Sequence, residues 1–104
     1  MATTTIAGRE YEVNEEGFIT DPTVWTEELG AELAKLIGID LTDAHWKAIR
    51  FLREDYGVMG ETPTLRRVST QAGIPVKELF TLFPGKPAKK MAYVAGLPKP
   101  KGCV

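Results

Sequence analysis

The fold is decided by the stretch TDAHWKAIRFLREDYG, residues 42–57, because its apolar residues recur at every third or fourth position. Thr42 is a good N-cap for a helix, and Gly57 is expected to end it. The spacing predicts an amphipathic helix that packs one face on a core. Its expected inward residues are Trp46, Ile49, Leu52 and Tyr56.

A second helix is predicted just before this stretch. Apolar residues recur at helical spacing, acidic residues cluster early, and Gly38 supplies a stop. Thr23 or Thr26 can cap the first turn. The residues expected to face the core are Trp25, Leu29, Leu33 and Leu36.

The first twenty residues have the period of strands. Glu10 to Val13 alternate between polar and apolar, and Gly8-Arg9 and Glu16-Gly17 are turn signals. This pattern predicts a small β-hairpin. Its expected inward residues are Tyr11, Val13 and one of Phe18 and Ile19.

Three shorter helices are predicted after residue 60, with proline near each start and glycine or proline at each end. They run from Thr62-Pro63 to Gly73, from Pro75 to Pro84, and from Pro87 to Gly96. Their expected inward residues are Leu65, Val68, Val76, Leu79, Phe80, Phe83, Met91 and Val94.

The predicted fold is mainly α: a compact bundle of about five helices with a helix-turn-helix-like pair, a small N-terminal β-hairpin and a mobile C-terminal arm. A chain of 104 residues with 43% hydrophobic content can bury one modest core. We therefore expect one domain over residues 1–104, made of a hairpin (1–20), a helical bundle (21–96) and an arm (97–104).

Charge is divided unevenly along the chain. Residues 1–62 hold thirteen of the fourteen acidic residues and five basic ones, whereas residues 63–104 hold eight basic residues and Glu78. This asymmetry indicates an anionic or acidic partner. No apolar run approaches the roughly 20 residues that span a bilayer, and no secretory signal opens the chain, so we expect a cytoplasmic protein without a membrane partner.

Few residues are arranged for catalysis or for binding a cofactor. The sequence has no glycine-rich phosphate loop, one cysteine and one histidine, so we expect neither a metal nor a cofactor. His45 is expected to be exposed in the first turn of its helix. A Cys103–His45 dyad is disfavoured, because a nucleophile needs a fixed base and this cysteine lies on the arm.

The single cysteine, Cys103, is the residue best suited to chemistry. It lies next to last in the chain, beyond two prolines that favour an extended path and after a glycine, and this placement exposes it. Lys99 and Lys101 favour the thiolate, although the terminal carboxylate of Val104 opposes it. A thiolate attacks sulfur electrophiles, so the expected product is a persulfide or a mixed disulfide.

The C-terminal sequence AGLPKPKGCV, residues 95–104, resembles the arm of the DsrC/TusE family, sulfur-relay proteins that include the gamma subunit associated with dissimilatory sulfite reductase. Further matches to the family pattern follow in order and cover nearly the whole chain. They are EEGF at 15–18, Trp25, LTDAHW at 41–46, FLR at 51–53, Pro63 with Arg66, and LFP at 82–84 with KPAK at 86–89.

The resemblance implies that Cys103 carries sulfur as a persulfide, making the chain a sulfurtransferase in the sense of a carrier and not a stand-alone catalyst. Two-cysteine members have another arm cysteine eleven residues earlier, where this chain has Ala92, so it is more similar to the one-cysteine TusE branch. The segment from Thr70 to Leu79 looks several residues shorter than in both branches.

The partners implied by the resemblance are sulfur-donor and sulfur-acceptor proteins: a sulfurtransferase complex, a tRNA thiolation enzyme or sulfite reductase. The arm and docking residues are Gly96, Leu97, Pro98, Lys99, Pro100, Lys101 and Gly102. The basic residues expected to bind a partner are Arg66, Lys86, Lys89 and Lys90.

The alternative is a DNA-binding regulator, because residues 65–80 fit a helix-turn-helix with glycine at the turn. The expected recognition helix offers no Arg, Asn or Gln for bidentate contacts to bases. Its outward residues are Lys77, Glu78 and Thr81. We therefore interpret the motif as a packing device, and direct nucleic-acid binding is not favoured.

Overall fold

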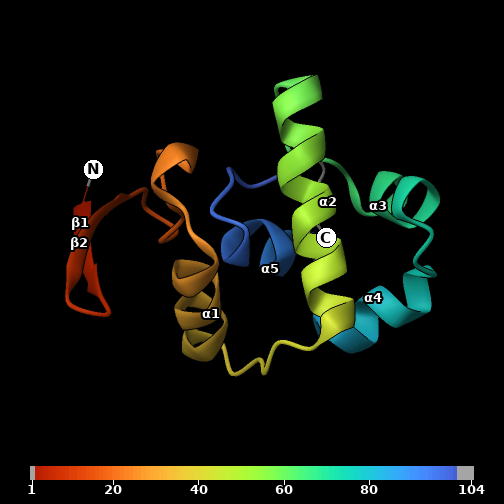
Figure 1. The fold of residues 1–104 in the computed structure, drawn as a ribbon, viewed down its shortest axis with the longest axis horizontal. Helices are drawn as coiled ribbons and strands as arrows, with labels where there is room; N and C mark the ends of the chain where they lie inside the picture. Colours follow the sequence, from red (N-terminus) through yellow and green to blue (C-terminus); the bar gives the residue numbers. More distant parts are fainter. Residues whose placement is uncertain (1, 101–104) are drawn as a thin grey trace.

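The computed structural model describes residues 2–100 of the chain. Its elements confirm a mainly α fold with an N-terminal hairpin (Figure 1). In order they are β1 (Ala2–Ile6), β2 (Arg9–Val13), the 3-10 turn η1 (Pro22–Val24), α1 (Glu27–Leu36), α2 (Asp43–Met59), α3 (Leu65–Ala72), α4 (Val76–Leu82) and α5 (Pro87–Val94).

The hairpin turns at Ala7 and Gly8, one residue earlier than Gly8-Arg9. Both turn residues have positive φ, 51° and 82°, which matches the twist of a two-residue hairpin turn. Val13 also forms an isolated antiparallel bridge with Ile19, across the turn at residues 15–17. Only one of Phe18 and Ile19 was expected to face the core, but both are buried. Phe18 packs in the main core, and Ile19 packs in a second cluster with the hairpin and α1.

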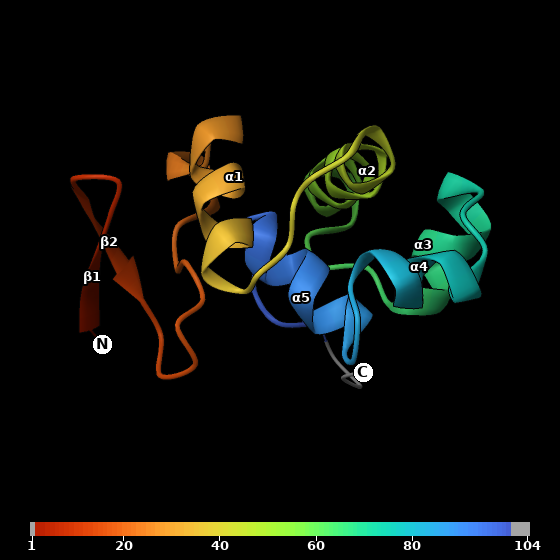
Figure 2. The same cartoon turned by 90° about the horizontal axis from the view of Figure 1, so that it is seen from below.

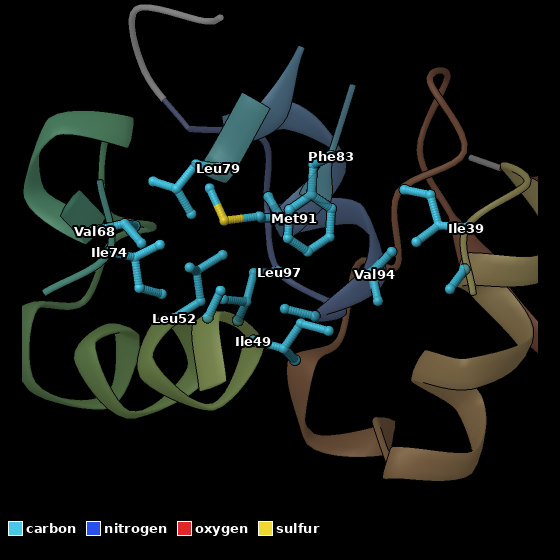
Figure 3. Close-up of a cluster of buried hydrophobic side chains, with 14 of the residues drawn as sticks. Ile39, Ile49, Leu52, Val68, Ile74, Leu79, Phe83, Met91, Val94 and Leu97 are labelled. Atoms are coloured by element: carbon cyan, nitrogen blue, oxygen red, sulfur yellow. The ribbon is translucent and has the colours of Figure 1, made fainter. Parts of the chain in front are cut away.

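Helix α5 is the centre of the bundle, between α1 and α2 (Figure 1). It also contacts α4, and α3 and α4 lie together at the end of the molecule away from the hairpin (Figure 2). Side chains from α2, α3, α4 and α5 form the main core, and Leu97 lies in this core near Leu52 and Met91 (Figure 3). This burial is the main stabilising contribution in a chain without a disulfide.

Three helix boundaries differ from prediction. α3 begins at Leu65 and not at Thr62-Pro63, because the Thr64 hydroxyl accepts a hydrogen bond from the Arg67 N–H and caps the helix. α2 continues through Gly57 to Met59 and ends at Gly60, whose φ of 74° and N–H bond to the Tyr56 carbonyl at 2.8 Å terminate the helix. α1 begins after Trp25, because Thr26 accepts a hydrogen bond from the Leu29 N–H and caps the helix.

Three predicted inward residues are exposed: Leu36, Val76 and Phe80. Leu36 is 64% exposed because it lies in the last turn of α1, beyond the packed face. α4 has only seven residues, and Leu79 is the one that the core buries, so Val76 and Phe80 face outward.

Candidate functional site

The root of the C-terminal arm is a fixed part of the bundle. Beyond α5 the Leu97 N–H bonds to the Ala92 carbonyl and the Gly96 N–H to the Tyr93 carbonyl, at 3.0 and 3.2 Å. Gly96 has a φ of 69°, so this is a glycine-based helix termination. It turns the chain so that Leu97, 1% exposed, enters the core.

The side chains of Trp25 and Arg53 donate hydrogen bonds to carbonyl groups of this helix termination. The Trp25 indole N–H donates to the Val94 carbonyl at 2.8 Å, and Arg53 donates to the Ala95 carbonyl at 2.7 Å. The Arg53 guanidinium lies 4.3 Å from the Trp25 ring centroid, within cation–π range. Burial lowers the pKa of Arg53, yet an arginine stays charged at neutral pH. Both residues belong to the motifs of the family resemblance, and here they bind the carbonyl groups at the end of α5, where the arm begins.

The first four arm residues lie against the bundle. The Thr62 hydroxyl donates to the Pro98 carbonyl at 2.7 Å, Lys99 forms an ion pair with Glu16 at 3.2 Å, and Pro100 is buried. The predicted arm of residues 97–104 is therefore anchored over 97–100. Lys101, Gly102, Cys103 and Val104 lie outside the described residues, so the reactive thiol and the expected effect of Lys101 stay predictions.

Glu16 links the arm to α5. Its carboxylate also pairs with Lys89 at 3.4 Å, and the Lys99 and Lys89 ammonium groups lower the pKa of Glu16. Next to this junction is a pocket of about 500 Å³. The pocket brings together three of the four basic residues expected to bind a partner, Lys86, Lys89 and Lys90. The fourth, Arg66, is exposed on α3 and does not line this pocket.

His45 is buried, contrary to the expectation that it is exposed. Its Nδ1 accepts the Thr42 N–H at 3.0 Å, and its Nε2 donates to the Leu82 carbonyl at 2.8 Å. This histidine therefore caps α2 and ties its start to the end of α4. Because both ring nitrogens are bonded, the structure gives no support to His45 as a base for a thiol.

An ion pair that sequence reasoning missed joins α2 to α3. Arg67 donates two hydrogen bonds to Asp55, at 2.7 and 2.9 Å, and lowers the pKa of that carboxyl. Asp55 is 7% exposed, so this is a partly buried, bidentate pair. Asp55 and Arg67 are twelve positions apart on two helices, and no local pattern predicts their contact.

The helix-turn-helix pair has the geometry expected of a packing device. Arg67 is engaged by Asp55, and α4 exposes the apolar residues Val76 and Phe80 beside Lys77, Glu78 and Thr81. Bidentate contacts to base edges need Arg, Asn or Gln side chains, and α4 has none. The described structure therefore provides little for duplex recognition.

Residues 2–100 contain no group of three or more His, Cys, Asp or Glu side chains placed to hold a metal ion. Over the same residues, no helix is both long and apolar enough to cross a membrane. Ala92, which the family resemblance equates with the second cysteine of two-cysteine members, lies in α5 with no exposed surface, so it belongs to the core and not to the arm.

The chain is similar over its whole length to known proteins. A family model described as DsrC like protein matches residues 5–104. The gamma subunit of dissimilatory-type sulfite reductase from Nitratidesulfovibrio vulgaris is 39% identical over 105 residues, covering 100% of each chain. Sulfurtransferase TusE of Escherichia coli is 34% identical over 104 residues, covering 93% of this chain and 95% of the relative.

Solved structures share the fold. The oxidized gamma subunit of dissimilatory sulfite reductase (DsrC) from Archaeoglobus fulgidus superposes with a TM-score of 0.83 at 35% identity, over 99% of this chain and 100% of that one. The NMR structure of Allochromatium vinosum DsrC superposes with a TM-score of 0.86 at 36% identity, over 98% of this chain and 97% of that one.

The alignment lengths correct one expectation about the segment from Thr70 to Leu79. The Nitratidesulfovibrio gamma subunit aligns over 105 residues with complete coverage of both chains, which leaves no room for a gap of several residues. The expectation that this segment is several residues shorter than in both branches is therefore wrong for this relative.

Proposed function

The chain belongs to the DsrC-like protein family, and from this we propose that it is a sulfur carrier whose Cys103 takes up sulfur as a persulfide and passes it to a partner protein. The observation that carries the proposal is that the family match runs to residue 104, so that it includes the penultimate cysteine and the whole arm motif. The relatives named for sulfur transfer and for sulfite reductase support the same chemistry.

The loading step is an exchange between sulfur atoms. The Cys103 thiolate attacks the outer sulfur of a donor persulfide, an S–S bond forms at Cys103, and the donor's S–S bond breaks. The outer sulfur keeps its proton, and the donor leaves as a thiolate, so no external oxidant or reductant is needed. An acceptor thiolate then attacks the outer sulfur of the Cys103 persulfide, which forms the acceptor persulfide and releases Cys103 as a thiolate.

The anchored arm root supports a carrier more than a catalyst. Trp25, Arg53 and Gly96 fix where the arm leaves the bundle, which limits the positions that a thiol seven residues beyond Gly96 can reach. With His45 bonded at both nitrogens, the described residues offer no imidazole to activate a thiol. The partner protein would then supply the rest of the reaction site.

The partners are proposed to be a sulfur-donor protein and a sulfur-acceptor protein in the cytoplasm. One relative is named as the gamma subunit of sulfite reductase and another as a sulfurtransferase, so both assemblies are candidate acceptors. Ala92 removes the second thiol of two-cysteine members, and an internal disulfide cycle is therefore unavailable. A single-thiol carrier passes sulfur only between molecules.

A two-step transfer assay tests the proposal. The chain is loaded from a small-molecule persulfide, freed of donor, and mixed with an acceptor thiol whose persulfide is then measured. We expect sulfur to appear on the acceptor as it is lost from the chain. A loaded chain that never releases sulfur to any thiol would contradict the carrier role.

No observation favours the alternative of a DNA-binding regulator. The relatives give it no support, and α4 offers no Arg, Asn or Gln for bidentate contacts to bases.

A further inference from the structure

A pocket lies near Gly96 and Leu97, where the arm leaves the bundle, and the proposed sulfur exchange at Cys103 assigns no role to its residues. It is formed where the loop after the hairpin meets the first turns of α5, and its volume is about 500 Å³. Its walls combine three lysines and one carboxylate with apolar and aromatic surface. The charged residues are Glu16, Lys86, Lys89 and Lys90, and the apolar and aromatic surface comes from Phe18, Ile37 and Tyr93.

The pocket has a cationic rim over an apolar floor. Phe18 and Tyr93 meet edge to face at 5.7 Å, and burial raises the pKa of Tyr93, so its hydroxyl stays neutral. Lys86 and Lys90 have no ion pair among those described and remain partly or fully accessible. A ligand that suits both parts carries negative charge around an apolar group.

The pocket is also coupled to the arm through Glu16. This carboxylate, 44% exposed at its side chain, pairs with Lys89 in the pocket and with Lys99 in the arm. A carboxylate entering the pocket beside Lys89 would compete with Glu16 for the same ammonium group. A ligand in the pocket would therefore affect the same carboxylate, Glu16, that pairs with Lys99 of the arm.

We propose that this pocket is the docking site for an acidic segment of the partner protein, with one apolar or aromatic side chain inserted between Phe18, Ile37 and Tyr93 and flanking carboxylates on Lys86 and Lys90. The inference rests on the proposed carrier function and names the partner surface that function requires. An occupant here is held next to the root of the arm that carries Cys103. Docking would align the partner's reaction site with the arm before sulfur moves.

The test is an NMR titration of the full-length chain with the peptide Asp-Glu-Phe-Asp-Glu, blocked at both ends. We expect amide shifts at residues 16–18, 37 and 85–93, and weaker binding as salt is raised. The same peptide with Ser in place of Phe should bind about tenfold more weakly, because the apolar floor is then unused. Equal binding of the two peptides, or shifts scattered over the surface, would overturn the proposal.

Charge reversal supplies the matched variants. The double variant Lys86→Glu with Lys90→Glu should reduce peptide affinity at least tenfold, whereas Lys77→Glu on α4 has the same type of change outside the pocket and should alter it less than about twofold. Amide spectra of each variant check the fold. If folding suffers, Lys86→Gln with Lys90→Gln replaces the double reversal and should still weaken binding. Preference for a single-stranded oligonucleotide over the peptide at this pocket would also overturn the proposal.

The outcomes for the two proposals are distinguishable. Peptide binding is measured without a sulfur donor, and sulfur loading is measured without the peptide. A chain that loads sulfur and does not bind the peptide contradicts the docking site alone. A chain that binds the peptide and takes up no sulfur contradicts the carrier function.

Discussion

Gly96 packs directly against the indole ring of Trp25. A Cβ at position 96 would lie 2.5 Å from Trp25 Cδ1, and φ at this glycine is 69°. The glycine of the arm motif is therefore a close-packing residue. It allows the end of α5 to turn beneath a tryptophan seventy-one positions earlier in the chain, and the arm starts from that contact.

Gly96→Ala should destabilise the protein more than a change at another left-handed glycine. Gly38 has a similar φ of 74°, and a Cβ at that position would meet nothing within 4 Å, so Gly38→Ala should cost about 1–2 kcal/mol from backbone strain alone. Gly96→Ala adds the clash with Trp25, about 1–3 kcal/mol more. Urea unfolding measures both variants, and equal losses would show that the Trp25 contact does not constrain Gly96.

Thr62→Val should loosen the anchored part of the arm. The change keeps the shape of the side chain and removes the hydroxyl that bonds to the Pro98 carbonyl, costing about 1 kcal/mol. Amide relaxation or hydrogen exchange at Lys99 reports the effect locally. Thr70→Val on α3 is the control, because its hydroxyl bonds only within its own helix. An unchanged Lys99 amide in Thr62→Val would indicate that this bond does not hold the arm.

The Asp55–Arg67 pair should make stability depend on pH in the acid range. Arg67 lowers the pKa of Asp55 below its ordinary 3.8, so the pair stabilises the fold above that pH and the contribution is lost as the pH falls through the folded-state pKa. At pH 7, Asp55→Asn should lower the free energy of unfolding by about 1–3 kcal/mol.

The gap in unfolding free energy between wild type and Asp55→Asn should begin to narrow below about pH 3.8, where Asp55 of the unfolded chain takes up a proton. It should close at still lower pH, where the folded-state carboxylate is protonated as well. Urea unfolding from pH 7 to pH 3 measures both proteins, with Asp43→Asn as an exposed control. A constant gap across this range would mean that the ion pair does not contribute through its charge.

The sequence predicted the helices well because glycine, proline and apolar spacing act locally. It missed Gly60 as the end of α2, since Gly57 is an equally good local stop and only the folded helix shows that its dihedrals stay helical. The burial of His45 and the Glu16–Lys99 pair depend on chain segments 37 and 83 positions away. Contacts of this kind leave no periodic pattern.

The arm lysines should govern the rate of transfer to the partner. Lys99→Ala with Lys101→Ala should slow sulfur transfer roughly threefold to tenfold, mainly through slower association, because rim charges steer encounter. The effect should shrink as salt is raised. Stopped mixing at several partner concentrations separates association from chemistry, and Lys77→Ala is the control. If the variant has an unchanged association rate and a slower transfer rate at saturating partner, the lysines act in the chemical step and not in association.

The intact mass of the chain after incubation with a persulfide donor tests the carrier function itself. We expect that the wild type gains about 32 Da, one sulfur atom, that the gain maps to Cys103 and is reversed by a reducing thiol, and that Cys103→Ser gains nothing. A wild type that takes up no sulfur from any persulfide donor, or a Cys103→Ser variant that takes it up equally, would contradict the carrier function.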